Sequence, residues 1–165
     1  ISRSVLSSGD MVDFSIIQHL KTKHQVVVGQ ATAEAVKIQT GNLDPAALQP
    51  GFQLEVKGRD LNSGIPTAVS VDAIELWEVI AGRMSAVIVE LRAALEKIPP
   101  ELSSDIIDTG LLLTGGMSMM KALDRMIGGE IGIPVAVAEN PMTAGISGAG
   151  QLLEDTDLLE KISVY

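Results

Sequence analysis

The stretch Leu111–Met120, LLLTGGMSMM, decides the fold of this chain. Residues 110–114 are almost wholly apolar, which is typical of a short strand covered on both faces of a parallel sheet. Gly115 and Gly116 then turn the chain, and residues 118–127 are predicted to continue as a helix. Two glycines at the carboxyl end of such a strand, followed by a helix N-terminus, let the backbone approach a ligand closely. A tight turn that needs positive φ explains the same glycines, and the pattern alone leaves both interpretations open.

The residues around this stretch continue the alternation of strands and helices. Ile133–Ala138 is predicted as a second buried strand and Pro141–Leu153 as a helix of small residues. The longest helix of the chain is predicted to run from its N-cap, Asp72, to the Pro99-Pro100 pair. Its apolar stripe includes Trp77, which we expect to be largely buried against the sheet. Strands that alternate with helices indicate a parallel sheet with right-handed crossovers, and hence an α/β lobe.

The N-terminal part of the chain has a different pattern. It is predicted to contain, in order, a strand end at 1–6, a helix at 11–23, a β-branched run at 24–28, a helix at 32–38 closed by Gly41, a loop at 42–51, and a hairpin with strands at 52–57 and 67–71. Because the hairpin interrupts the α/β alternation, we expect an insertion at 17–72 within a lobe formed by 1–16 and 73–165.

Composition narrows the class of protein. The chain has 165 residues, of which 46% are hydrophobic and 2% aromatic, so it can bury an aliphatic core. The absence of cysteine excludes disulfides and thiolate metal sites, and a net charge of −9 argues against a nucleic-acid partner. No apolar run approaches the ~20 residues of a membrane span. Because the chain begins at Ile1 and shows no signal-peptide pattern, we expect an excised piece of a cytoplasmic chain.

Two charged residues are the first candidates for ligand contacts. Glu34 and Lys37 are three positions apart on the predicted 32–38 helix, so both side chains lie on one face. A carboxylate can accept hydrogen bonds from ribose hydroxyls, and a lysine stem can cover an adenine ring while its ammonium donates hydrogen bonds. An ordinary surface ion pair between the two residues is the competing interpretation.

Other titratable and sulfur-bearing residues have plainer explanations. Asp10 and Asp13 could be paired carboxylates, but helix capping and a favourable interaction with the helix dipole explain them better. His19 and His24 have no convincing acidic partner in the sequence pattern, so we expect solvated or packed histidines rather than metal ligands. The clustered methionines are interpreted as flexible core filler. They are Met117, Met119, Met120 and Met126.

The order of motifs resembles one family, the bacterial actin-like rod-shape proteins of the MreB type. The resemblance rests on SGDMVDFSIIQHL (8–20), VGQATAEAVKIQTG (28–41), VKGRDLNSGIP (56–66), KIPPELSSDIIDTGLLLTGG (97–116) and GIPVAVAENPMTAGISGAGQLLE (132–154). These segments follow one another in the family's order over essentially the whole chain. Two positions depart from the family pattern, because Gln30 replaces a glutamate and Met117 replaces a glycine of the turn.

The resemblance implies half of a four-subdomain ATPase that holds ATP between two lobes. The implied fold is an actin-like ATPase (ribonuclease H-like) lobe, a sheet with flanking helices and a small inserted α+β subdomain. This chain would be the second lobe, subdomain IIA with IIB inserted at 17–72. Glu34 and Lys37 would flank the adenosine, and Gly115, Gly116 and Met117 would pass under it. The phosphate loops of the first lobe are not in this chain, so no catalytic or metal-binding residue is assigned, Mg²⁺ is expected only with that lobe, and the chain alone is expected to be inactive.

The implied function is that of a cytoskeletal subunit. The family polymerises into filaments, lies in the cytoplasm at the inner face of the cell membrane, and determines rod shape with the cell-wall elongation proteins. Its membrane association would come from the missing lobe. Half of a related small-molecule kinase, a stand-alone nucleotide-binding module, and an interaction domain without a ligand are the alternatives.

Overall fold

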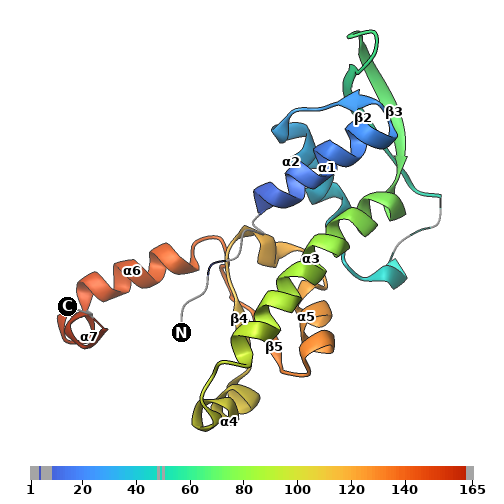
Figure 1. The fold of residues 1–165 in the computed structure, drawn as a ribbon. Helices are drawn as coiled ribbons and strands as arrows, with labels where there is room; N and C mark the ends of the chain where they lie inside the picture. Colours follow the sequence, from blue (N-terminus) through green and yellow to red (C-terminus); the bar gives the residue numbers. More distant parts are fainter. Residues whose placement is uncertain (1–3, 5–8, 48, 50, 163–165) are drawn as a thin grey trace.

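The computed structural model describes residues 4, 9–47, 49 and 51–162. The strand end predicted at 1–6 therefore lies, except for Ser4, outside the described residues. A long helix, α3 (Ala73–Leu95), runs through the middle of the molecule (Figure 1). On one side of it lie the helices α1 (Gly9–Lys23) and α2 (Gln30–Thr40) with a three-stranded sheet, and at its far end lies a two-stranded sheet. The predicted division into 1–16 with 73–165 and 17–72 stays a prediction.

The helix α3 forms as its sequence predicts. The side chain of Asp72 accepts a hydrogen bond from the backbone N–H of Ile74 at 2.8 Å, which is the geometry of an N-cap. The buried stripe of the helix includes Leu76 and Ile80, whereas Trp77 is only half-buried beside the core. The core fills the space between the three helices and the inner face of the sheet. Its fully buried side chains are Val12, Ile16, Leu20, Val26, Val56, Val71, Leu76 and Ile80.

The three-stranded sheet is antiparallel and contains the predicted hairpin. Its order is β1 (Val26–Val27), β2 (Gln53–Asp60) and β3 (Pro66–Asp72). Asp60 shapes the hairpin turn, because its Oδ1 accepts hydrogen bonds from the backbone N–H of Ser63 at 2.6 Å and from the Ser63 hydroxyl at 2.8 Å. These bonds hold the pKa of Asp60 below its ordinary value. The short 3₁₀ helix η1 (Pro45–Ala47) lies in the loop before β2.

The two-stranded sheet confirms the parallel pairing but not its predicted burial. β4 (Leu111–Leu113) pairs in parallel with β5 (Val135–Val137). Leu113 packs against the core, whereas the side chain of Leu112, which points to the opposite face, is 67% exposed. The prediction of a strand covered on both faces is therefore wrong for the described chain. The helix α5 (Leu123–Ile131) contacts β5, and among the described residues no element covers the face that carries Leu112.

The α-helix after the glycine pair begins later in the chain than predicted. A 3₁₀ helix, η2 (Gly116–Met119), follows Gly115, and α5 begins only at Leu123. The reason is a backbone connection to the end of α2. The N–H of Lys121 donates to the carbonyl of Gly41 at 2.9 Å, and its own carbonyl accepts from Leu43 at 2.8 Å. The residues of this bridge are not helical. The glycine turn is therefore followed by a single 3₁₀ turn and not by the N-terminus of an α-helix.

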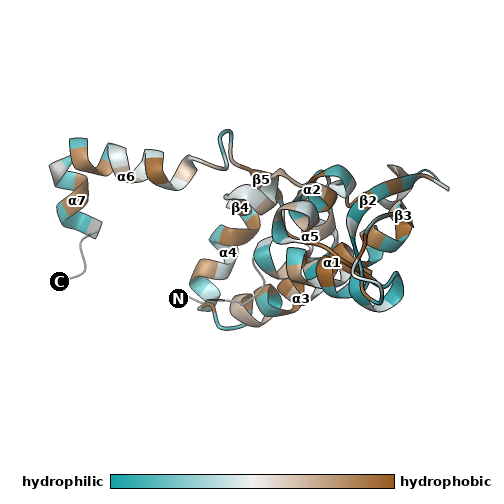
Figure 2. Cartoon of the chain, turned by 90° about the horizontal axis from the view of Figure 1, so that it is seen from above, coloured by the Kyte–Doolittle hydropathy of each residue, from teal (hydrophilic) through white to brown (hydrophobic). Residues whose placement is uncertain are grey.

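The remaining helices lie at the ends of the two-stranded sheet. α4 (Pro100–Thr109) begins at the second residue of the proline pair, with Pro99 as its N-cap. α6 (Ala144–Glu154) and α7 (Thr156–Ile162) extend away from the rest of the molecule in both views (Figures 1 and 2). No described residue of α6 is buried, and its Ile146 side chain is 76% exposed. Brown apolar bands mark both helices (Figure 2), and α6 and α7 contact each other.

Candidate functional site

A pocket of about 590 Å³ lies where the start of α1, the outer face of α2 and the glycine turn meet. Glu34 and Lys37 line it from α2, and Gly116 and Met117 line it from η2. Gly115 stands just before these last two residues and shapes the turn without lining the pocket. The further lining residues are Gly9, Asp10, Ile38, Gly41, Met119, Met120 and Met142. The structure thus brings together four of the five residues that the sequence analysis singled out.

Lys37 is held by a carboxylate from another helix. Its Nζ lies 2.8 Å from Oδ1 of Asp13 and donates to the carbonyl of Gly9 at 3.3 Å. The side chains of Lys37 and Asp13 are only 12% and 3% exposed. The interpretation of Asp13 as a cap or dipole residue is therefore wrong, and so is that of a surface pair between Lys37 and Glu34. Spacing along the chain could not reveal this pair, because its members come from α1 and α2.

The other two acidic residues at the pocket remain accessible. Glu34 is exposed at the pocket rim, and Asp10 is exposed in the first turn of α1, where its charge suits the helix dipole. The Nε2 of Gln30 donates to Oδ1 of Asp10 at 3.3 Å. Asp10 and Asp13 consequently do not form a paired-carboxylate site, because one is a solvated residue and the other is a buried ion-pair partner.

The glycine turn gives the pocket a backbone floor. Gly115 has φ of +83°, which confirms the predicted need for positive φ, and its N–H donates to the carbonyl of Pro141 at 2.7 Å. The Ser118 hydroxyl donates to the carbonyl of Gly115 at 2.6 Å and closes the turn. A Cβ added at Gly9 would lie 3.3 Å from Nζ of Lys37 and 3.4 Å from Sδ of Met117. Gly9, which the sequence analysis did not single out, therefore keeps α1 close to both residues.

The methionines are divided between the core and the pocket. Met120 is buried and Met126 packs against the core, as predicted for filler residues. Met119 and Met142 are more than 60% exposed at the pocket, so the filler interpretation is wrong for Met119. Thioether side chains around a pocket provide a polarisable and adaptable apolar wall.

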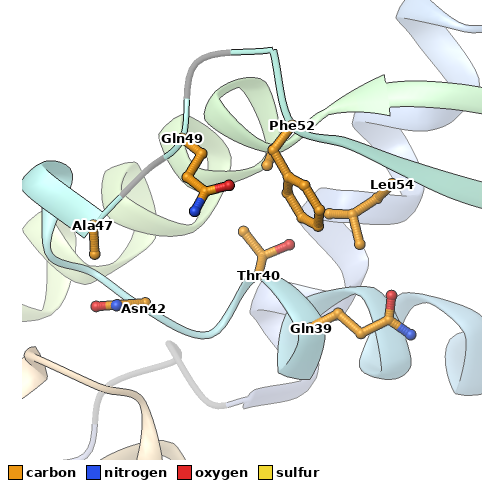
Figure 3. Close-up of a pocket in the computed structure, with 8 residues that line it drawn as sticks. Gln39, Thr40, Asn42, Ala47, Gln49, Phe52 and Leu54 are labelled. Atoms are coloured by element: carbon orange, nitrogen blue, oxygen red, sulfur yellow. The ribbon is translucent and has the colours of Figure 1, made fainter.

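A second, smaller pocket of about 310 Å³ lies between the end of α2 and the start of β2 (Figure 3). Phe52 and Leu54 form its apolar wall, and its lining also includes the polar residues Gln39, Thr40 and Gln49 (Figure 3). None of its described lining residues is titratable. This pocket therefore offers hydrogen bonds but no acid or base.

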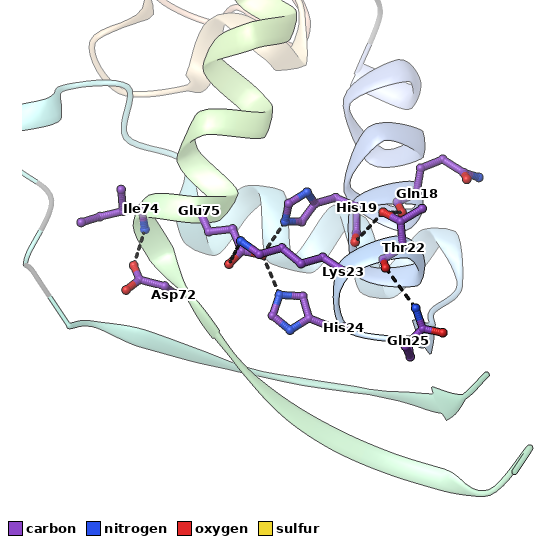
Figure 4. Close-up of polar contacts among 9 residues, drawn as sticks. All are labelled: Gln18, His19, Thr22, Lys23, His24, Gln25, Asp72, Ile74 and Glu75. Carbon is purple, nitrogen blue, oxygen red and sulfur yellow. Dashed lines mark hydrogen bonds and ion pairs between the residues drawn. The ribbon is translucent and has the colours of Figure 1, made fainter. Parts of the chain in front are cut away.

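The two histidines of the chain meet one carboxylate, which the sequence analysis did not foresee (Figure 4). Nε2 of His19 and Nε2 of His24 both lie within hydrogen-bond distance of Oε1 of Glu75, the latter at 2.6 Å. Nζ of Lys23 lies 2.7 Å from the other oxygen, Oε2. Burial works to raise the pKa of Glu75, but hydrogen bonds from Lys23, His24 and His19 outweigh it and lower the pKa to about 2. The prediction that the histidines have no acidic partner is wrong. The sequence pattern could not show this partner, because Glu75 is more than 50 residues away from both histidines.

Among the described residues, no helix combines the length and the apolarity that a membrane crossing requires.

Comparison with known proteins places the chain in a family. A model described as MreB/Mbl protein matches residues 1–161. The chain is 35% identical to the cell shape-determining protein Mbl of Bacillus subtilis (strain 168) over 160 residues, which cover 97% of this chain and 47% of that protein. It is 37% identical to the cell shape-determining protein MreB of Escherichia coli (strain K12) over 157 residues, 95% of this chain and 45% of that protein. The chain thus spans about half the length of these curated relatives.

Solved structures agree with this placement. MreB 5 of Spiroplasma citri bound to AMPPNP is similar with a TM-score of 0.85 at 25% identity, over 98% of this chain and 47% of that one. The ADP-bound form is similar with a TM-score of 0.86 at 24% identity, over 99% of this chain and 49% of that one. A MamK double helical filament shares the fold, with a TM-score of 0.72 at 18% identity, over 92% of this chain and 46% of that one. The fold is that of an actin-like ATPase lobe, and the chain belongs to the MreB/Mbl family of cell shape-determining proteins.

Proposed function

We propose that this chain supplies the adenosine side of an ATP site and acts as the second lobe, IIA with inserted IIB, of a filament-forming cell-shape protein. One observation carries the proposal: Glu34, Lys37, Gly116 and Met117 line a single pocket. Its volume of about 590 Å³ lies within the usual ~300–1,000 Å³ of small-molecule sites. The nucleotides named for the two Spiroplasma citri structures, AMPPNP and ADP, support the same ligand class.

The side chains of the pocket suit a nucleoside. The exposed carboxylate of Glu34 can accept hydrogen bonds from ribose hydroxyls. The ammonium of Lys37 is already bonded to Asp13 and Gly9, so we assign to Lys37 the role of covering the base with its aliphatic stem. Met117 and Gly116 provide an apolar wall and a backbone floor on the side of the turn. Gly115 contributes indirectly by setting the path of the backbone.

Phosphate and metal contacts are assigned to the other half of the longer relatives. The charged side chains of the described pocket lining are two acidic residues, Asp10 and Glu34, and the engaged Lys37. None of these is a free cation that could neutralise the β- and γ-phosphates. We therefore expect Mg²⁺ binding and hydrolysis only when the companion lobe is present, and we expect this chain alone to lack ATPase activity.

Filament formation is proposed for the longer protein that contains this lobe. MamK, which shares the fold, is described as a double helical filament. A filament of one subunit type needs a heterologous interface that does not close into a ring. We propose that the assembled protein lies at the cytoplasmic face of the membrane, attached through the companion lobe, and directs cell-wall elongation proteins. The match to the MreB/Mbl model over residues 1–161 favours this function over half of a small-molecule kinase.

Nucleotide titration followed by NMR tests the proposal on the ¹⁵N-labelled chain. Adenosine, ADP and ATP are expected to bind weakly, in the millimolar range, and with similar affinity, because only the nucleoside side of the site is present. Amide shifts should be confined to the glycine turn and the neighbouring face of α2. Gly116→Val should abolish these shifts by filling the pocket floor, whereas Glu101→Gln, a substitution on α4 outside the pocket, should leave them unchanged.

Two results would contradict the proposal. Shifts centred on the smaller pocket beside Phe52 would place the ligand elsewhere. Micromolar ATP binding with turnover by this chain alone would show that the companion lobe is not needed.

A further inference from the structure

Three donor atoms converge at the junction of α1 and α3 (Figure 4). Nε2 of His19 comes from the last turns of α1, Nε2 of His24 from the residue after that helix, and Oε1 of Glu75 from the first turn of α3. These three atoms all lie within 4.8 Å of one another. The two imidazole rings are tilted by 57° with their centroids 6.1 Å apart, so they approach the carboxylate from different directions.

We propose that His19, His24 and Glu75 form a divalent transition-metal site, with Zn²⁺ as its ion, that fastens the end of α1 to the start of α3. The set of two imidazoles and one carboxylate is a donor combination that Zn²⁺ accepts, with a fourth position left for water. This inference uses none of the residues of the nucleotide pocket and does not depend on the proposed function.

The geometry requires little rearrangement. Donors in a tetrahedral zinc site lie about 3.3 Å apart, as follows from metal–donor distances of about 2.0–2.1 Å. Nε2 of His24 is 2.6 Å from Oε1, so a small outward rotation of the rings opens the space that an ion needs. The side chains of all three residues are partly exposed, between 14% and 22%. His19 also lines a groove between α1 and α3, which gives solvent a path to the ion.

One oxygen of the carboxylate is shared with the two histidines and the other with a lysine. Oε1 of Glu75 faces both imidazoles, and a carboxylate oxygen is a ligand that Zn²⁺ accepts beside histidine nitrogen. Lys23 is the group that competes, because its Nζ lies 2.7 Å from Oε2. The Lys23 side chain is 58% exposed and can move into solvent, or it can stay on Oε2 while the metal takes Oε1. Lys23 is therefore a neighbour of the site and not one of its ligands.

Calorimetric titration of the 165-residue chain with zinc chloride, after removal of any oligohistidine tag, tests the proposal. We expect one Zn²⁺ per chain with a dissociation constant in the micromolar range or below. His24→Ala and Glu75→Gln should each weaken binding by at least about tenfold. Lys23→Gln should keep binding or tighten it by about threefold, since a nearby positive charge is removed. Glu101→Gln, a carboxylate change on the distant helix α4, should have no effect.

Co²⁺ provides a second readout that does not depend on folding stability. Its visible spectrum should change to that of a four-coordinate ion on binding wild-type chain, and the spectrum of the hydrated ion should persist with His24→Ala. Absence of stoichiometric Zn²⁺ binding by the wild-type chain would overturn the proposal. Equal affinity in wild type and His24→Ala would also overturn it, as would loss of binding in Lys23→Gln.

Discussion

Lys37 of α2, which lines the proposed nucleotide pocket, forms a buried ion pair with Asp13 of α1, with Nζ and Oδ1 2.8 Å apart. Gly9, one turn before Asp13, accepts a second bond from the same ammonium through its carbonyl. The pair therefore ties together α1 and α2, the two helices that border the pocket. It also decides how Lys37 can serve a ligand, because its charge is already neutralised within the protein.

Removal of one partner of this pair should destabilise the fold strongly. Asp13→Ala or Lys37→Met leaves a buried charge without its counterion, which costs about 3–5 kcal/mol. The double variant, which removes both charges, should cost clearly less than the sum of the two single changes. Urea unfolding followed by circular dichroism measures all three. Additive single-variant losses would show that the two side chains do not interact.

The acid stability of the metal-free chain should depend on Glu75. The pKa of Glu75 is lowered to about 2 in the folded chain from an ordinary 4.5, so its ionised form stabilises the fold. This contribution is fully present above about pH 4.5 and is lost as the pH falls toward about 2. It amounts to roughly 1–3 kcal/mol after allowance for solvent screening.

Urea midpoints measured with a chelator present across this pH range test the expectation. Glu75→Gln should be less stable than wild type at neutral pH and should lose less stability on acidification. Glu101→Gln on α4 serves as the control and should follow the wild-type curve. A Glu75→Gln chain with the wild-type pH dependence would assign the acid transition to other groups.

Local patterns predicted the elements of this fold well. Asp72 as an N-cap, the proline pair after α3, the hairpin and the parallel pairing of β4 with β5 all follow from residues close in sequence. Such features depend on backbone preferences and on hydrophobic periodicity, which a single sequence displays directly. The exposed face of Leu112 did not follow, because three adjacent leucines do not reveal how many faces are covered.

The candidate site was predicted only in part, for a similar reason. Glu34 and Lys37 share a helix face, and Gly116 and Met117 share a turn, so each pair was visible in the sequence. Asp13 as the partner of Lys37 was not visible, since it required the packing of α1 against α2. The meeting of His24 with Glu75 likewise depends on α1 and α3 being neighbours. Contacts between polar residues that are distant in sequence leave no periodic pattern, so a single sequence does not reveal them.

Gly115 should resist substitution although its side-chain position is open. A Cβ there would meet no atom within 4 Å, but φ of +83° is unfavourable for any L-residue with a side chain. Gly115→Ala should therefore cost about 1–2 kcal/mol of stability. Gly129→Ala is the matched control, because Gly129 lies within α5, has no positive φ and also has open space around it. That change should stabilise the chain by about 0.5–1 kcal/mol. Thermal unfolding of both variants separates strain from crowding, and equal effects would argue against strain at the turn.

Substitutions of a buried leucine, Leu76, and of an exposed one, Leu112 on the uncovered face of β4, should have different effects on stability. Leu76 is fully buried in the hydrophobic core, so Leu76→Ala should leave a cavity and cost about 2–5 kcal/mol. Leu112 is 67% exposed in this chain, so Leu112→Thr, which places a β-branched residue suited to a strand there, should change stability by less than about 1 kcal/mol. Urea unfolding of the two variants gives both values. A large loss for Leu112→Thr would mean that the outer face of β4 is covered in solution, by a second copy of the chain if the loss depends on protein concentration and by a segment of the same chain if it does not.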